Sequence, residues 1–214
     1  MISKLHYITQ EVPTYSHDEL AEYACAGGVD WVQLRIKNKS YNDCLAIAIK
    51  TEAICKKHGA KLIINDNVTL AKAIRADGVH LGKADMHPLE ARKILSDGFI
   101  IGGTANTFED IEKLIEAGVD YIGLGPFRFT STKENLSPIL GIEGYEQLLK
   151  KCSDKGFNIP IIAIGGIKAE DVKPLIQIGL YGIAVSSAIN LSENKTETAK
   201  RFLNKLKIAT DKNH

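Results

Sequence analysis

The sequence has no long hydrophobic run and no excess of charge of one sign. No uninterrupted apolar run of about 18 residues occurs, so we expect no transmembrane helix. Residues 1–9 are too polar and too few for a signal peptide. The 27 Lys and Arg residues nearly balance the 26 Asp and Glu residues, giving a formal net charge of +1. Near-neutrality gives no overall electrostatic reason to bind a nucleic acid or a membrane, and we expect neither as a partner.

Cysteine is also scarce, and its spacing excludes the common cysteine frameworks. No C-x-x-C pair and no zinc-finger spacing occurs among Cys25, Cys44, Cys55 and Cys152. Reduced thiols are therefore favoured over disulfides or a metal site, and we expect a cytoplasmic protein. Hydrophobic residues make up 44% of the chain and charged residues 25%, close to the average of globular domains. This composition argues against a disordered chain.

Short apolar runs alternate along the chain with longer amphipathic runs. The short runs predict strands at 5–9, 31–35, 61–64, 78–81, 99–103, 121–125, 161–164 and 182–185. The amphipathic runs predict helices at 18–26, 41–58, 68–75, 88–94, 108–117, 144–152, 169–177 and 196–208. Several helices end in glycine just before the next strand, as in Ala117-Gly118. Strict alternation predicts a parallel sheet with right-handed crossovers.

Two architectures fit this alternation: a closed (βα)₈ barrel and an open, doubly wound sheet. Eight units without a glycine-rich fingerprint after the first strand favour the α/β fold of a TIM barrel. Length alone allows one large domain or two small ones. The chain shows no linker and no low-complexity segment, so we expect one domain over 1–214 with a short flexible tail at 211–214.

In such a barrel, chemistry sits at the carboxyl ends of the strands. Gln33, Arg35 and Lys37 alternate after the second strand and share one side, which favours a site for an anion and a polar ring. Asp66 and Asp85 follow two neighbouring strands, and two convergent carboxylates can hold Mg²⁺ together with water and phosphate oxygens. Asp66 has an alternative role as a helix cap.

Hydroxyl-rich and glycine-rich segments follow the later strands. Thr104 has two open readings, a helix cap or a ligand contact. The segment from Gly125 to about Gly141 is long for such a loop and contains three adjacent hydroxyls before a lysine, which can bind phosphate oxygens: Thr130, Ser131, Thr132 and Lys133. A second phosphate site is indicated after the seventh and eighth strands by Gly166, Ser186 and Ser187.

Taken together, these motifs resemble the thiamine-phosphate synthase family over nearly the whole chain. Any one motif is weak, but the set is specific: Gln33-Leu34-Arg35 with Lys37, Asn65-Asp66, Ala76 to Gly82, Asp85-Met86, Tyr121 to Pro126, Thr130 with Thr132-Lys133, and Ile164 to Ile167. The resemblance implies a (βα)₈ barrel that joins a hydroxymethylpyrimidine diphosphate to a thiazole phosphate, or to its carboxylated form, and releases diphosphate. The resemblance further implies that the diphosphate leaves first and that the thiazole nitrogen traps the resulting carbocation.

The resemblance also implies roles for individual residues. Gln33, Arg35, Lys37 and Asn65 would hold the pyrimidine diphosphate, while Asp66 and Asp85 would ligate Mg²⁺. Arg35 and Lys133 would act in catalysis by stabilising the departing diphosphate. The thiazole and its phosphate would contact the remaining matched residues: Thr130, Ser131, Thr132, Gly166, Ser186 and Ser187. Thr104 keeps a hydroxyl where the family commonly has serine.

Four positions depart from the family pattern, and two other functions compete. The departures are Ile36 for Glu, Lys83 for Gln, Asn106 for His and Phe129 for Pro. One competing function is a thiazole tautomerase, which would need no diphosphate–Mg²⁺ site. The other is a non-catalytic phosphate-ligand binder, which would tolerate loss of the charged cluster. Covering helices and interface helices look alike in a sequence, so a homo-oligomer stays open as the assembly.

Overall fold

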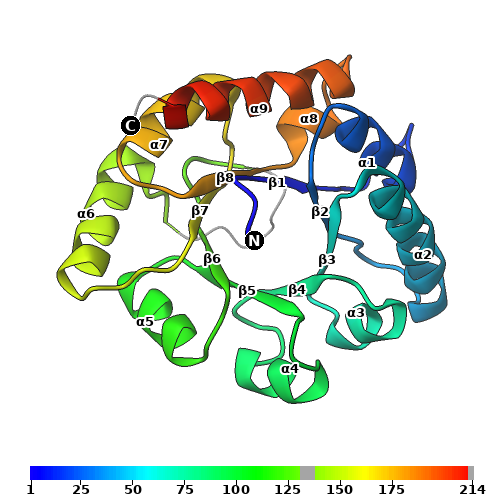
Figure 1. The fold of residues 1–214 in the computed structure, drawn as a ribbon, viewed down its shortest axis with the longest axis horizontal. Coiled ribbons are helices and arrows are strands. Elements are labelled where there is room, and N and C mark those ends of the chain that lie inside the picture. Colours follow the sequence, from blue (N-terminus) through cyan, green and yellow to red (C-terminus); the bar gives the residue numbers. More distant parts are fainter. Residues whose placement is uncertain (131–137, 212–214) are drawn as a thin grey trace.

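Eight parallel strands close into a barrel in the computed structural model, which describes residues 1–130 and 138–211 (Figure 1). Each strand pairs with the next in chain order, and the last pairs with the first. The strands are β1 (Leu5–Ile8), β2 (Trp31–Leu34), β3 (Lys61–Asn65), β4 (Gly78–Leu81), β5 (Ile100–Ala105), β6 (Tyr121–Leu124), β7 (Ile161–Ile164) and β8 (Gly182–Val185). The predicted fold class is confirmed.

Helices ring the barrel on the outside (Figure 1). They are α1 (His17–Ala26), α2 (Tyr41–His58), α3 (Val68–Ile74), α4 (Pro88–Ile94), α5 (Phe108–Glu116), α6 (Gly141–Asp154), the 3₁₀ helix η1 (Ala169–Asp171), α7 (Val172–Gln177), α8 (Ser187–Asn190) and α9 (Lys195–Asp211). Their apolar faces and the outward side chains of the strands form one continuous core.

Element boundaries differ from the sequence prediction by a few residues, and two differences affect the site. The fifth strand extends to Ala105 and so includes Thr104. The sixth helix begins at Gly141, three residues before the predicted start. The final helix reaches Asp211, the first residue of the predicted tail, and residues 212–214 lie outside the described part of the chain.

Aromatic rings fill the interior of the barrel. The ring of His6 stacks on Trp31 with centroids 4.2 Å apart and meets Tyr121 edge-on at 4.9 Å. The Tyr121 ring occupies the space over Gly102 on the neighbouring strand, where an added Cβ would lie 2.1 Å from Cζ of the tyrosine. Glycine on β5 therefore makes room for the large side chain on β6, and the barrel is a packed core rather than a pore.

The buried His6 predicts a pH dependence of stability. Burial, followed by the charge on His80, lowers the pKa of His6 to about 3, whereas an unfolded histidine titrates near 6.5. Unfolding therefore takes up a proton between these values, so the free energy of unfolding falls by about 1.4 kcal/mol per pH unit as pH drops below about 6.5. Urea unfolding from about pH 7 to about pH 5 measures this slope. The His6→Phe variant keeps a ring but cannot titrate, and an equal slope in both proteins would contradict the assignment.

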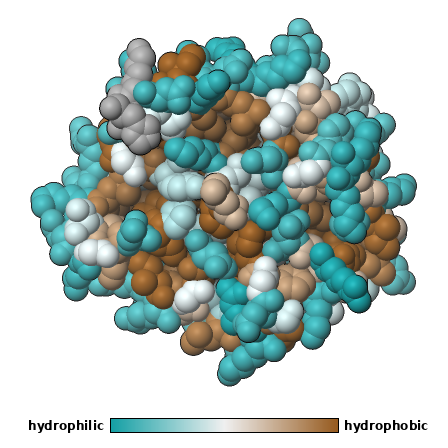
Figure 2. Space-filling model, in the orientation of Figure 1, coloured by the Kyte–Doolittle hydropathy of each residue, from teal (hydrophilic) through white to brown (hydrophobic). Residues whose placement is uncertain are grey.

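The surface of the barrel is mixed in character. Figure 2 shows hydrophilic residues spread around the outline of one face, with hydrophobic residues between them. In the described ranges, no helix has both the length and the apolar character needed to cross a membrane. At the end where strands begin, aspartates accept hydrogen bonds from strand backbone. Asp120, for example, accepts from the N–H of Ile101 at 2.8 Å and pairs with Arg92, also at 2.8 Å.

Candidate active site

One cavity of about 490 Å³ lies at the carboxyl ends of the strands. Eleven of the fourteen predicted site residues line it: Gln33, Arg35, Lys37, Asn65, Asp66, Asp85, Thr104, Thr130, Gly166, Ser186 and Ser187. The other three, Ser131, Thr132 and Lys133, lie outside the described residues. Six strands lie between Gln33 on β2 and Ser186 after β8, yet barrel closure brings these residues to one opening.

Two carboxyl groups face one another in this cavity. Asp66 follows β3 and Asp85 lies in the loop after β4, and their side chains are within hydrogen-bonding reach of each other. Asp85 also accepts the backbone N–H of Gly82 at 2.6 Å. Because both groups carry negative charge when ionised, they repel each other unless a proton or a cation lies between them.

The backbone around Asp66 settles one open alternative. Helix α3 is capped by Asn67, whose side chain accepts from the N–H of Leu70 at 2.9 Å. The Asp66 carboxylate is thus not used as a cap and points into the cavity. Asp66 has a left-handed backbone with φ of 65°, a conformation that costs free energy in a residue with a Cβ. Such strain is typical of functional sites.

The two carboxyl groups differ in acidity. Burial raises the pKa of Asp66, but hydrogen bonds from Asp85 and Lys37 outweigh burial, so the pKa lies below its ordinary value. For Asp85, burial and the hydrogen bond to Asp66 act in the same direction and raise the pKa. Of the two groups, Asp85 therefore takes up a proton at a higher pH than Asp66 does.

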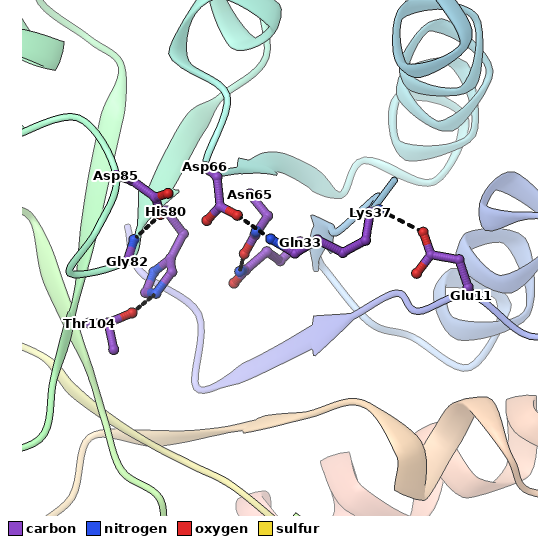
Figure 3. Close-up of polar contacts among 9 residues, drawn as sticks. All are labelled: Glu11, Gln33, Lys37, Asn65, Asp66, His80, Gly82, Asp85 and Thr104. Atoms are coloured by element: carbon purple, nitrogen blue, oxygen red, sulfur yellow. Dashed lines mark hydrogen bonds and ion pairs between the residues drawn. The ribbon is translucent and has the colours of Figure 1, made fainter. Parts of the chain in front are cut away.

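Cationic side chains surround the acidic pair. The ammonium of Lys37 lies 2.6 Å from Oδ2 of Asp66, and its backbone N–H donates to Glu11 (Figure 3). Arg35 makes no ion pair with any carboxylate in residues 1–130 or 138–211. Lys83, one of the departures from the family pattern, pairs instead with Asp110 at 2.7 Å. The charge of Arg35 is therefore available to an anionic ligand.

Two amide side chains orient each other beside the cations. Nε2 of Gln33 donates to Oδ1 of Asn65 at 2.7 Å, across the neighbouring strands β2 and β3 (Figure 3). The bond fixes the rotamer of both amides, and each keeps a donor or acceptor for a ligand. This pair suits a flat, polar heterocycle, as the alternation of Gln33 and Arg35 predicted.

A buried histidine reaches the cavity through Thr104. His80 accepts or donates at both ring nitrogens: Nδ1 lies 2.9 Å from Oη of Tyr121, and Nε2 lies 3.0 Å from Oγ1 of Thr104. Burial raises the pKa of Tyr121, so the phenol keeps its proton and can donate to Nδ1. In the neutral form of His80 with Nδ1 as the acceptor, Nε2 donates to Thr104, and the hydroxyl proton of Thr104 is left for a ligand. Thr107 caps α5, which resolves the open alternative for Thr104.

His80 also lines the cavity, although it is not among the predicted site residues. It is 8% exposed, as expected of a structural histidine. The signal was its alternation on β4, where Val79 and Leu81 face outward and His80 faces the barrel interior. Asn106 was noted only as a departure from the family pattern. It lines the same cavity and donates to the carbonyl oxygen of Gly125.

The opposite side of the cavity is formed by backbone. Gly165 and Gly166 have φ of 104° and 65°, and within the described residues the N–H of Gly166 has no acceptor. Ser186 donates its hydroxyl proton to Gln10 at 2.9 Å, so it is held in place rather than free to donate. Ser187 begins the short helix α8 next to it. Backbone N–H groups and one serine hydroxyl are therefore the donors that face a ligand here.

The donor set of the acidic pair fits Mg²⁺. This ion prefers hard oxygen ligands and is usually bound by one or two carboxylates together with water and substrate phosphates. Over the described part of the chain, no group of three or more His, Cys, Asp or Glu residues is placed to hold a metal. Asp66 and Asp85 therefore suit a cation that arrives with a phosphorylated ligand.

Acidic, cationic and backbone donors at the carboxyl end of a (βα)₈ barrel define an enzyme that handles phosphorylated small molecules. The sequence pattern of the thiamine monophosphate synthase family matches residues 5–189. The chain belongs to this family, which confirms the predicted resemblance and the enzyme class of thiamine-phosphate synthase.

Relatives of the same family cover almost the full chain. A thiamine-phosphate synthase of Bacteroides fragilis is 50% identical over 94% of this chain and 98% of that protein. One of Flavobacterium johnsoniae is 47% identical over 96% of this chain and 97% of its own length. A solved thiamine phosphate pyrophosphorylase of Pyrococcus furiosus superimposes with a TM-score of 0.85 at 28% identity, covering 96% of each chain.

Proposed function

We propose that this barrel joins 4-amino-2-methyl-5-hydroxymethylpyrimidine diphosphate to 4-methyl-5-(2-phosphooxyethyl)thiazole or its carboxylated form. The products are thiamine phosphate and diphosphate, with CO₂ in addition from the carboxylated substrate. The observation that carries this proposal is the pairing, in one cavity, of an acidic and cationic cluster with a separate backbone-lined anion site. A reaction between a diphosphate and a monophosphate needs both.

The proposed pyrimidine side comprises the amides and cations. Gln33 and Asn65 would hydrogen-bond the ring, and Arg35 and Lys37 would neutralise the diphosphate. The thiazole phosphate would lie against Gly166 and Ser187, with Ser186 fixing the shape of the turn. Thr104 and Thr130 line the space between these two ends, where the reacting atoms would meet. Ser131, Thr132 and Lys133 retain their predicted roles at the phosphates.

Bond breaking would precede bond making. The bond between the pyrimidine methylene and the diphosphate oxygen breaks, and both electrons leave with the diphosphate. The amino-substituted ring stabilises the methylene cation, and the lone pair of the thiazole nitrogen then forms the new C–N bond. Arg35 and Lys37 hold the negative charge that develops on the leaving group, and no group needs to remove a proton before bond formation.

Asp66 and Asp85 are the residues that would hold Mg²⁺. The ion supplies charge neutralisation for the diphosphate in that position. Lys37 would have two partners, the Asp66 carboxylate that it contacts at 2.6 Å and the diphosphate. The four cysteines are free, which fits the reducing environment of the cytoplasm, where we place the enzyme.

A product assay with the purified protein tests this function. We expect thiamine phosphate from the two substrates, with a rate at least about 10²-fold lower when Mg²⁺ is chelated, because charge on the leaving group is then poorly neutralised. Turnover of a thiazole tautomer without any diphosphate substrate would favour the tautomerase instead. Binding of both phosphorylated ligands without turnover would favour a non-catalytic binder.

A further inference from the structure

An ion pair outside the cavity joins the two loops that carry its phosphate-facing residues. Arg128, in the loop after β6, contacts Asp171 of η1 through two parallel bonds. Nη1 lies 2.7 Å from Oδ2 and Nη2 lies 2.7 Å from Oδ1. The side chain of Asp171 is 10% exposed, so the pair is partly shielded from water. Two parallel bonds to a shielded carboxylate fix the orientation of the guanidinium as well as its position.

The same arginine holds the glycine turn. Nη1 also donates to the carbonyl oxygen of Gly166 at 3.1 Å. The backbone N–H of Arg128 donates to the carbonyl oxygen of Gly165, also at 3.1 Å. The N–H of Phe127 donates to the carbonyl oxygen of Ile164 at 2.8 Å. The loop after β6 is thereby bound along the start of the loop after β7. With the carbonyl groups engaged on this side, the N–H of Gly166 is directed away from the loop.

Packing adds to these polar contacts. The guanidinium of Arg128 lies over the ring of Phe127, 4.7 Å from its centroid. The carboxylate of Asp171 accepts in turn from the N–H of Lys168 at 2.7 Å, which ties the far side of the β7 loop to the same ion pair. Gly166 and Thr130 are among the residues that line the cavity, whereas Arg128 and Asp171 are not. The pair therefore acts on a ligand only through the residues that it holds.

We propose that Arg128 and Asp171 are positioning residues that set the affinity of the site for the thiazole phosphate. This inference rests on the proposed function for the identity of the ligand. The ion pair holds the turn at Gly165 and Gly166 in the arrangement in which it can receive a phosphate. Without the pair, only a fraction of molecules has that arrangement, and the apparent dissociation constant rises in inverse proportion to the fraction.

Steady-state kinetics of matched variants tests the proposal. We expect Arg128→Ala and Asp171→Asn each to raise KM for the thiazole phosphate by about 10-fold. The kcat and the KM for the pyrimidine diphosphate should stay within about 3-fold of wild type. Arg128→Lys keeps the charge but cannot form two parallel bonds to the carboxylate. Its KM for the thiazole phosphate should therefore lie between those of Arg128→Ala and wild type. In the double variant, KM for the thiazole phosphate should be no higher than in the single variant with the higher KM, because the two substitutions remove the same interaction.

Arg92→Ala is the control for general destabilisation. Arg92 also pairs with an aspartate, Asp120, and donates to a backbone carbonyl, but at the opposite end of the barrel. It should lose stability without a change in either KM. The proposal is overturned if KM for the thiazole phosphate is unchanged in Arg128→Ala and Asp171→Asn, or if Arg92→Ala raises it equally.

Calorimetric binding of the thiazole phosphate separates this proposal from the proposed reaction. If the wild-type protein forms no product but binds the thiazole phosphate about 10-fold more tightly than Arg128→Ala, the reaction is wrong and the positioning role stands. If the wild-type protein forms product and both proteins bind the ligand equally, the reaction stands and the positioning role is wrong.

Discussion

Asparagine in place of either Asp66 or Asp85 is expected to lower kcat/KM by about 10²–10³-fold. Each substitution removes one negative charge from a pair whose side chains are within hydrogen-bonding reach of each other. Asparagine keeps the shape of the side chain and tolerates the left-handed backbone at position 66, so the fold should be preserved. The loss should be accompanied by a higher Mg²⁺ concentration at half-maximal rate, measured by titration.

A second measurement tests the proposed Mg²⁺ site without turnover. The melting temperature of the wild-type protein should rise when Mg²⁺ and inorganic diphosphate are added together, because both bind the folded state. In Asp66→Asn and Asp85→Asn this rise should be much smaller. Without Mg²⁺, Asp85→Asn should be at least as stable as wild type, since repulsion between the carboxylates is relieved, whereas Asp66→Asn should be less stable because it loses the ion pair with Lys37.

Lys37→Met is the control that separates metal binding from ligand binding. It removes the cation that contacts Asp66 at 2.6 Å but leaves both carboxylates in place. Its Mg²⁺ titration should not shift to higher concentration, although KM for the pyrimidine diphosphate should rise. An unchanged Mg²⁺ titration in both aspartate variants would remove these residues from the metal site.

The fold was accessible from sequence because the local signals agree with the global architecture. Each strand is buried on both faces and reads as a short apolar run, as in Leu62-Ile63-Ile64. The predicted element boundaries were wrong where the residue type did not indicate the structural environment. The fifth strand was predicted to end at Gly103, whereas in the structure it continues through Thr104 to Ala105. Within this strand, Gly102 and Gly103 make room for Tyr121 and Leu114.

The composition of the site was predictable, but its internal connections were not. A barrel places residues that follow strands at one end, and this rule found Asp66, Asp85 and Gly166. It does not say which side chains contact each other. The link from Tyr121 through His80 to Thr104 depends on strand register, and the contact between Lys83 and Asp110 depends on how α5 packs. The pair of Arg128 and Asp171 joins two loops, for which a sequence has no periodic signal.

Gly166→Ala is expected to lower kcat/KM for the thiazole phosphate by about 10²–10³-fold. Two costs arise at this position. The φ of 65° disfavours any residue with a Cβ, and the added Cβ would lie 2.5 Å from Cγ of Arg128 and 2.8 Å from the carbonyl oxygen of Phe129. The backbone at Phe129 cannot move aside as readily as a flexible side chain can. The glycine turn or the loop after β6 must therefore shift. The N–H of Gly166 would then leave the position from which it can meet a phosphate.

Gly59→Ala separates backbone strain from displacement of the turn. Gly59 ends α2 with φ of 67°, almost the same as at Gly166, but an added Cβ would meet nothing within 4 Å. Both variants should lose about 1 kcal/mol of unfolding free energy in urea titrations because both place alanine in the left-handed region, and Gly166→Ala should lose more because of its contact with the loop after β6. Only Gly166→Ala should lose affinity for the thiazole phosphate in calorimetry. Equal affinity in the two variants would mean that the phosphate binds elsewhere in the cavity, since the strain is matched and only the contact with the loop after β6 differs.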